Sequence, residues 1–272
     1  MASKALGGLD HAGAGRARWI EVLGRVGLVA KGVSYALVGF LALRLATGAG
    51  GAATSRQGAL ANIATHGWGQ LVLVLLALGF AAYALWRFAE TIWPITDDDG
   101  AKKFAKQAGT LGRALIYAGL TYSALKIAFG SAQEESQTGK AQHATAEVLS
   151  WPGGTWLAGL VGACVVGAGL YNGYRGLTRK FTKRWQKQDE VARWGERLGV
   201  VGLLARGVVF GLIGAFLIKA AAEYDPREAI GLDGALQKLA RQTYGEWLLG
   251  LSAAGLVAYA IFCLVEARHR RV

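Results

Sequence analysis

Ionisable and aromatic side chains with helical spacing lie inside the most apolar stretches of this chain. Tyr83, Arg87 and Glu90 occupy positions i, i+4 and i+7, so a helix places all three on one face. An ionisable side chain at the centre of a bilayer costs at least ~2.5–3.5 kcal/mol. Such residues are therefore expected either to pair with one another or to bind a charged ligand.

The same pattern recurs in other apolar stretches. The corresponding polar triples are Tyr171/Arg175/Thr178 and Tyr259/Cys263/Glu266. In the alternate stretches a cation precedes an aromatic residue by four positions, at Lys31/Tyr35, Arg113/Tyr117 and Arg206/Phe210. Together they predict an intramembrane polar cluster of Lys31, Tyr35, Tyr83, Arg87, Glu90, Arg113, Tyr117, Tyr171, Arg175, Arg206, Tyr259 and Glu266.

Two interpretations of this polar cluster are open. In the structural one, which the sequence favours, Lys31 pairs with Glu90 and Arg206 pairs with Glu266, and each pair pins one helical hairpin. In the functional one, the cluster lines a charged vestibule that is open to the cytoplasm and takes an anion or a lipid headgroup. The middle copy of the pattern has Thr178 where the others have an acid, so it should carry a cation without an acidic partner.

No familiar catalytic pattern accompanies the cluster. The four histidines are scattered over predicted tails and loops, and there is no Gly-x-Ser-x-Gly, His-Glu-x-x-His or phosphate-loop motif. Asp97, Asp98 and Asp99 are interpreted as a solvated acidic loop, and Cys164 and Cys263 lack metal-ligand spacing. We expect a protein that is not an enzyme and has no catalytic residue, cofactor or metal site.

The elements that hold the cluster are apolar stretches of membrane-spanning length. Hydrophobic residues make up 53% of the chain, and six stretches reach the ~20 residues needed to cross a hydrocarbon core. They are expected at about 26–46, 69–92, 111–130, 155–176, 198–221 and 247–266. Many of the 40 glycines lie inside these stretches, where small residues let helices approach closely. We expect the closest approaches on the helices with repeated glycines, at Gly159, Gly162, Gly167, Gly169, Gly173, Gly207 and Gly211.

Two motifs divide the chain into three similar units. Gly-x-x-x-Tyr occurs at Gly79/Tyr83, Gly167/Tyr171 and Gly255/Tyr259, with successive copies 88 residues apart. Gly-x-x-Gly opens the other stretch of each unit, at Gly24/Gly27, Gly109/Gly112 and Gly199/Gly202. The predicted organisation is a flexible cytoplasmic tail (1–16) and two-helix repeats at 17–93, 94–180 and 181–272, the last with a short basic tail. Three such repeats predict an all-α integral membrane fold with six transmembrane helices and pseudo-threefold packing.

These motifs carry a resemblance to a known family. Over about residues 17–268, the Gly-x-x-Gly-x-x-x-[Lys/Arg]-Gly starts and Gly-x-x-x-Tyr ends resemble the bacterial six-transmembrane family catalogued as domain-of-unknown-function family 1206. The resemblance implies an integral membrane protein of bacteria with no established activity. It supplies no catalytic residues.

The distribution of cations predicts orientation and partners. With both termini inside, 20 Lys and Arg fall on the inner side and 8 on the outer side, which favours a multi-pass protein of the bacterial inner (plasma) membrane with both termini cytoplasmic. The basic loop 177–188, with Phe181 and Trp185, is expected to bind anionic lipids at the cytoplasmic face rather than nucleic acid. Short amphipathic stretches at Leu60/Ile63, Val148/Leu149 and Leu236/Leu239 are expected as helices on the outer surface.

Two classes of function follow. One is a small-solute, ion or lipid-handling membrane protein with a cytoplasm-facing polar vestibule. The alternative is a non-catalytic membrane scaffold that assembles with a membrane-protein partner. A polar cavity lined by Tyr83, Tyr171 and Tyr259 would favour the first class, and a closed, glycine-packed core would favour the second.

Overall fold

Helices make up all the regular secondary structure in the described part of the chain. The computed structural model describes residues 2–47, 69–93, 100–129, 136–185 and 189–269. The α-helices are α1 (Ala2–Ala46), α3 (Gly69–Ile92), α4 (Ala101–Ala128), α5 (Gln137–Leu149), α6 (Gly154–Leu177), α7 (Glu190–Ala222), α8 (Leu232–Ala240) and α9 (Gly245–His269). Two short 3₁₀ helices, η1 (Lys180–Arg184) and η2 (Pro226–Glu228), connect them.

The long helices coincide with the predicted apolar stretches. Within the described residues, five are long and apolar enough to cross a membrane, namely Trp19–Ala46 of α1 together with α3, α6, α7 and α9. The sixth predicted span lies in α4, which is 28 residues long but does not reach the same hydropathy. Its five cations, Lys102, Lys103, Lys106, Arg113 and Lys126, account for that difference.

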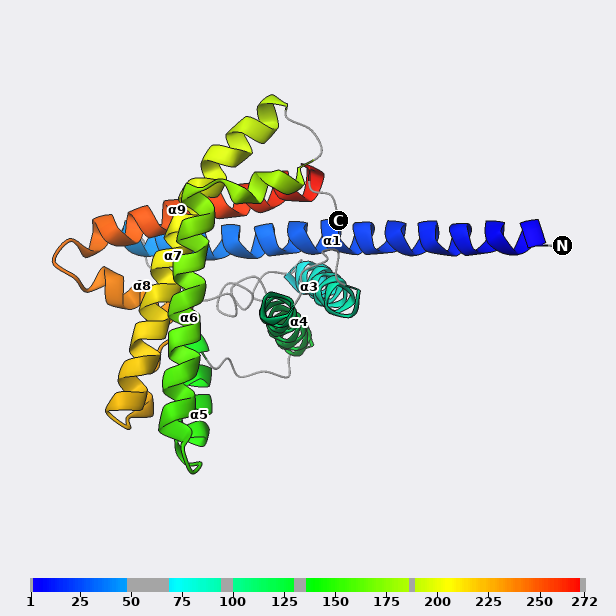
Figure 1. Cartoon of the computed structure of the whole chain (residues 1–272). Helices are drawn as coiled ribbons and strands as arrows, with labels where there is room; N and C mark the ends of the chain where they lie inside the picture. Colours follow the sequence, from blue (N-terminus) through cyan, green and yellow to red (C-terminus); the bar gives the residue numbers. More distant parts are fainter. Residues whose placement is uncertain (1, 48–68, 94–99, 130–135, 186–188, 270–272) are drawn as a thin grey trace.

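The amino-terminal segment differs from its prediction. Residues 1–16 were expected as a flexible tail, whereas the backbone is helical from Ala2 and continuous with the first span. The three prolines are Pro94, Pro152 and Pro226, so none interrupts this helix. Figure 1 shows the amino-terminal part of α1 projecting past the other helices.

The helices are joined into an open series rather than a closed ring. Side-by-side pairs form between α1 and α9, between α3 and α4, and between α6 and α7 (Figure 1). Contacts of α1 with α3 and of α7 with α9 connect these pairs. Among the described residues no extended contact joins α4 to α6, the two long helices of the middle repeat. The first and third repeats are therefore closed and the middle repeat is open.

Glycine explains how the first and third repeats close. A Cβ on Gly27 would lie 2.5 Å from the Cβ of Tyr83, and one on Gly202 would lie 2.6 Å from the Cβ of Tyr259. The glycines of the Gly-x-x-x-Tyr motif are also equivalent in the two repeats. A Cβ on Gly79 would lie 2.3 Å from the Cβ of Ala30, and one on Gly255 would lie 2.3 Å from the Cβ of Ala205. At the equivalent Gly112 and Gly167 of the middle repeat, a Cβ would have no heavy atom within 4 Å.

Glycines also hold α6 against α7, at the predicted Gly162, Gly169 and Gly207 but not at every predicted position. A Cβ on Gly169 would lie 2.8 Å from the carbonyl oxygen of Gly207, and one on Gly214 would lie 2.7 Å from that of Gly162. The prediction for Gly167 and Gly211 is wrong, because a Cβ at either position would project into open space. Positions 162 and 169 share a helix face, which position 167 does not.

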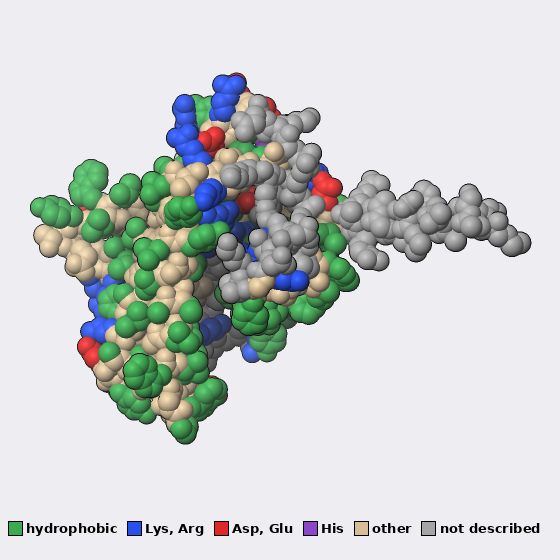
Figure 2. All heavy atoms as spheres, viewed as in Figure 1, with side chains coloured by type: hydrophobic (Ala, Val, Ile, Leu, Met, Phe, Trp, Pro, Cys, Tyr) green, Lys and Arg blue, Asp and Glu red, His purple; other side chains and the backbone are tan. Residues whose placement is uncertain are grey.

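Exposed side chains on α6 and α7 are of two kinds. Figure 2 shows apolar side chains spread over the arm that α6 and α7 form, with Lys and Arg at the end where α7 begins. The exposed apolar residues of α6 include Trp156, Leu157, Leu160, Val161 and Leu170. The exposed cations near the start of α7 include Arg179, Lys180, Arg193 and Arg197. This arrangement fits a helix pair with an apolar body and one basic end.

The short helices connect repeats to one another. The backbone N–H and hydroxyl of Thr138 in α5 donate to the carboxylate of Asp233 in α8, at 3.1 and 2.8 Å. Two of the predicted amphipathic stretches lie in these helices, with Val148/Leu149 at the end of α5 and Leu236/Leu239 within α8. The third, Leu60/Ile63, lies outside the described residues.

The carboxylate of Asp189 links the start of α7 to the end of α9. Asp189 caps α7 by accepting the backbone N–H of Ala192 at 2.8 Å, and its carboxylate lies 3.1 Å from Nε2 of His269. The hydrogen bonds from Ala192 and His269 hold the pKa of Asp189 below its ordinary value. Phe181, predicted at the lipid interface, is instead 4% exposed and packs against Phe262 at 5.0 Å between ring centroids.

We predict that glycine substitutions separate the closed repeats from the open one. Gly27→Ala and Gly202→Ala should each lower the free energy of unfolding by about 1–3 kcal/mol, because the new methyl group overpacks the tyrosine backbone. Gly112→Ala and Gly167→Ala are the matched controls at equivalent positions and should leave it unchanged or raise it. Thermal unfolding in nonionic detergent measures both sets. Equal losses in the two sets would contradict the open middle repeat.

Candidate functional site: a cationic cluster between the repeats

A buried lysine and a partly buried arginine lie against one tyrosine ring. The Nζ of Lys31 in α1 lies 5.1 Å from the ring centroid of Tyr259 in α9, and the Cζ of Arg206 in α7 lies 4.5 Å from it. Lys31 is 8% exposed and Tyr259 is 2% exposed. Lys31 also lies 5.5 Å from the ring of Tyr83. Contacts of this kind stabilise a desolvated cation by about 2 kcal/mol, but they do not neutralise its charge.

Arg206 keeps one edge of its guanidinium without a hydrogen bond. Its Nη1 donates to the hydroxyl of Tyr259 at 2.5 Å, and its Cζ lies 4.9 Å from the ring of Phe210 and 5.3 Å from that of Tyr35. Its Nε is buried and has no hydrogen-bond partner. The aromatic rings thus hold the guanidinium in place and leave the Nε–Nη2 edge for another group.

The predicted ion pairs between helices are absent from the described residues. Glu90 pairs with Arg87, three residues earlier on its own helix, rather than with Lys31. Arg87 also donates from Nη2 to the hydroxyl of Tyr83 at 2.9 Å and lies 4.0 Å from the Trp86 ring. A same-helix neighbour at i+3 needs no particular helix packing to come within reach, which explains why the local pair forms.

The predicted pair of Arg206 with Glu266 is absent as well. Glu266 is 5% exposed and lies within electrostatic range of Arg87, Tyr259 and Cys263. Of the two acids in the predicted cluster, Glu90 therefore pairs with Arg87, and Glu266 lies within electrostatic range of the same arginine. Across the described residues, no carboxylate lies within ion-pair distance of Lys31 or Arg206.

The middle repeat adds two further cations. Arg113 in α4 lies within electrostatic range of Arg87, Arg175 and Arg206, and Arg175 in α6 lies 6.0 Å from the ring of Tyr171. Within the described part of the chain neither arginine forms an ion pair. This agrees with the prediction that the middle repeat, which has Thr178 in place of an acid, carries a cation without an acidic partner. The cluster thus draws cations from five helices.

The tyrosines of the Gly-x-x-x-Tyr motifs have unequal roles. Tyr83 and Tyr259 are buried in the closed repeats, and the ring of Tyr83 lies 4.3 Å from that of Tyr117. Tyr171 in the open repeat is 57% exposed. None of the three lines the cavity described next, so among the described residues the tyrosine-lined cavity that would favour a solute, ion or lipid-handling function is not seen.

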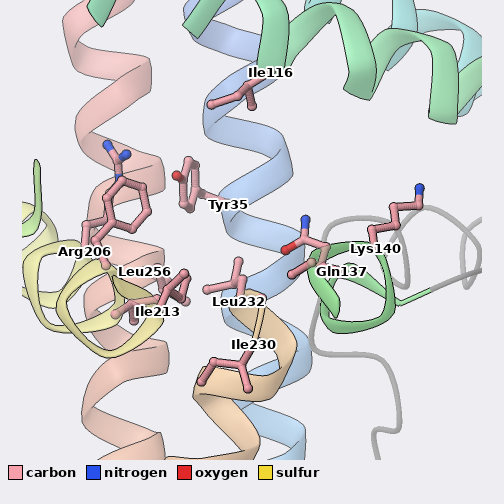
Figure 3. A pocket seen from close by; sticks show the side chains of 13 residues that line it. Tyr35, Ile116, Gln137, Lys140, Arg206, Ile213, Ile230, Leu232 and Leu256 are labelled. Atoms are coloured by element: carbon pink, nitrogen blue, oxygen red, sulfur yellow. The ribbon is translucent and has the colours of Figure 1, made fainter. Parts of the chain in front are cut away.

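A different cavity adjoins the cluster. It has a volume of about 360 Å³ and is bounded by α1, α4, α5, α7, α9 and the segment before α8. Arg206 and Tyr35 lie together at one side, and Gln137 and Lys140 lie at the opposite side (Figure 3). The sequence analysis missed Gln137 and Lys140, because a polar residue at the start of a surface helix carries no signal that it faces a cavity.

The cluster is not a metal site in the residues that the structure describes. No group of three or more His, Cys, Asp and Glu residues there is arranged to hold a metal ion. Its chemistry is that of guanidinium, ammonium and phenol groups, which donate hydrogen bonds to anions.

The fold and the cluster define a multi-pass helical membrane protein with buried cations between its repeats. The chain belongs to the family described as Domain of Unknown Function (DUF1206), whose model matches three times, at residues 26–93, 108–179 and 201–270. It is similar to "Uncharacterized protein YxxB" of Bacillus subtilis (strain 168), with 31% identity over 258 residues that cover 93% of this chain and 92% of that protein. No solved structure matches the chain.

We predict that the Arg87–Glu90 pair stabilises the first repeat. The two side chains are only 7% and 11% exposed, so Glu90→Gln strands a buried charge and should lower the free energy of unfolding by about 3 kcal/mol. The matched control is Glu196→Gln, whose partner Arg179 is 66% exposed and whose loss should cost less than about 1 kcal/mol. Denaturation in mixed micelles measures both. Equal effects would contradict the burial of the pair.

Proposed function

We propose that this protein handles an anion, either a small solute or a lipid headgroup, at the cationic cluster. The observation that carries the proposal is that no carboxylate of the described residues pairs with Lys31 or Arg206, which both lie against the ring of Tyr259. A buried ion without a counter-ion costs several kcal/mol. A bound anion offsets that cost at both residues, and hydrogen bonds to charged groups contribute about 1.5–3 kcal/mol each.

The excess of positive charge extends over the whole cluster. Five cations, Lys31, Arg87, Arg113, Arg175 and Arg206, accompany two acids, Glu90 and Glu266. A cleft of one sign between low-dielectric walls concentrates ligands of the opposite sign. We assign the protein a binding or transfer role and no catalytic activity, because the cluster provides donors for an anion but no nucleophile with an adjacent base.

The proposal includes a topology of six spans with both termini in the cytoplasm. At ~1.5 Å rise per residue, the 28 residues of α4 are long enough to cross a bilayer, and α4 lies beside α3. Its arginine then lies in the cluster and its lysines lie near its ends. The first and third repeats close in equivalent ways, whereas the open middle repeat departs from the predicted pseudo-threefold packing. The positive-inside distribution of cations supports the proposed orientation in the bacterial plasma membrane.

The alternative is a non-catalytic scaffold that holds another membrane protein. It is favoured by the exposed apolar face of α6, where Trp156 is 85% exposed and Leu170 is 71% exposed. A membrane helix presents such a face to lipid as readily as to a partner, so this face does not discriminate between the two functions. Anion binding at the cationic cluster does. A scaffold needs no anion, and its buried cations would bind none.

We predict that anion binding depends on Arg206. Purified protein in nonionic detergent should bind inorganic phosphate or an anionic phospholipid, and Arg206→Gln should weaken that binding about tenfold, the loss of one charged hydrogen bond. The matched control is Arg193→Gln on the same helix, since Arg193 is exposed and outside the cluster. Native mass spectrometry measures both ligands. An unchanged affinity in Arg206→Gln would favour the scaffold.

The topology is tested with single cysteines in a chain that carries Cys164→Ser and Cys263→Ala. We predict that Glu147→Cys reacts with an impermeant maleimide in intact cells, whereas Lys103→Cys and Arg193→Cys react only after permeabilisation. Lys103 and Glu147 are exposed residues on either side of the α4 span, so labelling of both from one side would show that α4 does not cross. A reversed pattern would overturn the orientation.

A further inference from the structure

We propose that the anion is the head of a single-chain amphiphile whose carboxylate or phosphate binds Arg206 and whose chain fills the adjoining cavity. This inference rests on the proposed function and names its ligand class. Three features of the described residues support it: the unpaired Nε–Nη2 edge of Arg206, the apolar wall of the cavity, and the lack of extended contact between α4 and α6 in the middle repeat.

The head site is the Nε–Nη2 edge of Arg206. Nη1 is occupied by the hydroxyl of Tyr259, and Nε is buried without a partner. Two parallel N–H donors match the two oxygens of a carboxylate or phosphate, and such bidentate pairs are stronger than single hydrogen bonds. Lys31, which lies 5.1 Å from the centroid of the same Tyr259 ring, adds a second positive charge near the site.

The chain site is the wall beyond that guanidinium. Between Arg206 and the polar side chains of α5, the cavity is lined by apolar residues that include Ile116, Ile213, Ile230, Leu232 and Leu256 (Figure 3). Arg206 and Ile213 are seven residues apart on one face of α7, a distance of about 10 Å at ~1.5 Å per residue. An inorganic anion would leave this wall uncovered, whereas an alkyl chain covers it.

The volume of the cavity limits the ligand to one chain. At about 360 Å³ it lies near the lower end of the range for ligand pockets, roughly 300–1,000 Å³. A two-chain phospholipid exceeds that space, so at most one of its chains would enter. The chemistry shared by the candidates is one alkyl chain with one anionic group, as in a fatty acid, an alkyl phosphate or a single-chain phospholipid.

The entry route is the gap between α4 and α6. Gly112 and Gly167, whose counterparts close the other repeats, face open space, and the neighbouring Leu115 is 65% exposed. Leu115 takes the place of Ala30 and Ala205, the small residues against which the other two repeats close. The larger side chain keeps this repeat from closing in the same way. Arg113 and Arg175 border the gap and attract an anionic head toward Arg206.

The test compares three probes on the whole protein in nonionic detergent by native mass spectrometry and thermal shift. Dodecyl phosphate and dodecanoate should bind at least about tenfold more tightly than inorganic phosphate, because burial of the alkyl chain adds a hydrophobic contribution that the inorganic ion lacks. Arg206→Gln should weaken all three. Ile213→Trp, which fills the chain site, should weaken only the two dodecyl probes. Val208→Trp, on an exposed face of α7, is the matched control and should change none.

The outcomes separate the inference from the function on which it rests. If inorganic phosphate binds as tightly as dodecyl phosphate and Ile213→Trp changes neither, the anion site stands and the chain site is wrong. If Arg206→Gln changes no probe, both proposals fall. Should Ile213→Trp not fold, Leu232→Trp fills the same cavity from the opposite wall, and retention of full dodecyl phosphate affinity in that variant overturns the chain site.

Discussion

The structure depends on two positive charges that share one tyrosine ring. Lys31 and Arg206 come from equivalent positions in the first and third repeats and meet at Tyr259. Like charges in a low-dielectric interior repel strongly, and neither has a carboxylate partner among the described residues. Aromatic faces and a phenol oxygen hold both cations in place without neutralising them, and the anion that we propose would offset their repulsion.

Glycine makes this meeting of charges geometrically possible. Gly27 and Gly202 let the backbones of Tyr83 and Tyr259 approach so closely that no side chain fits between the helices. The tyrosine rings are therefore fixed at the depth of the two cations. In the middle repeat the equivalent glycines are unopposed, with the larger Leu115 beside them. The Gly-x-x-Gly motif thus brings the two helices together in the first and third repeats but not in the middle repeat.

The sequence predicted the elements well and their pairings poorly. Apolar length located the long helices, because crossing a bilayer requires a run of residues that is visible in one dimension. Helical spacing placed the polar groups of each helix on one face, and Lys31, Tyr83, Arg206 and Tyr259 lie near one another, whereas Tyr171 is exposed. Partner choice was not predictable: Glu90 joins Arg87 on its own helix rather than Lys31, and Arg206 joins Tyr259. Those choices depend on helix rotation and on which repeat closes, which spacing along one helix does not specify.

A structure determined with native lipids retained tests the central claim most directly, through the density beside Arg206. Our account predicts density of an anionic group within hydrogen-bond distance of Nε and Nη2, continuous with a chain in the cavity that Leu256 and Ile213 line. An empty cavity, with a carboxylate of the protein itself such as Glu266 bound to Arg206, would contradict it.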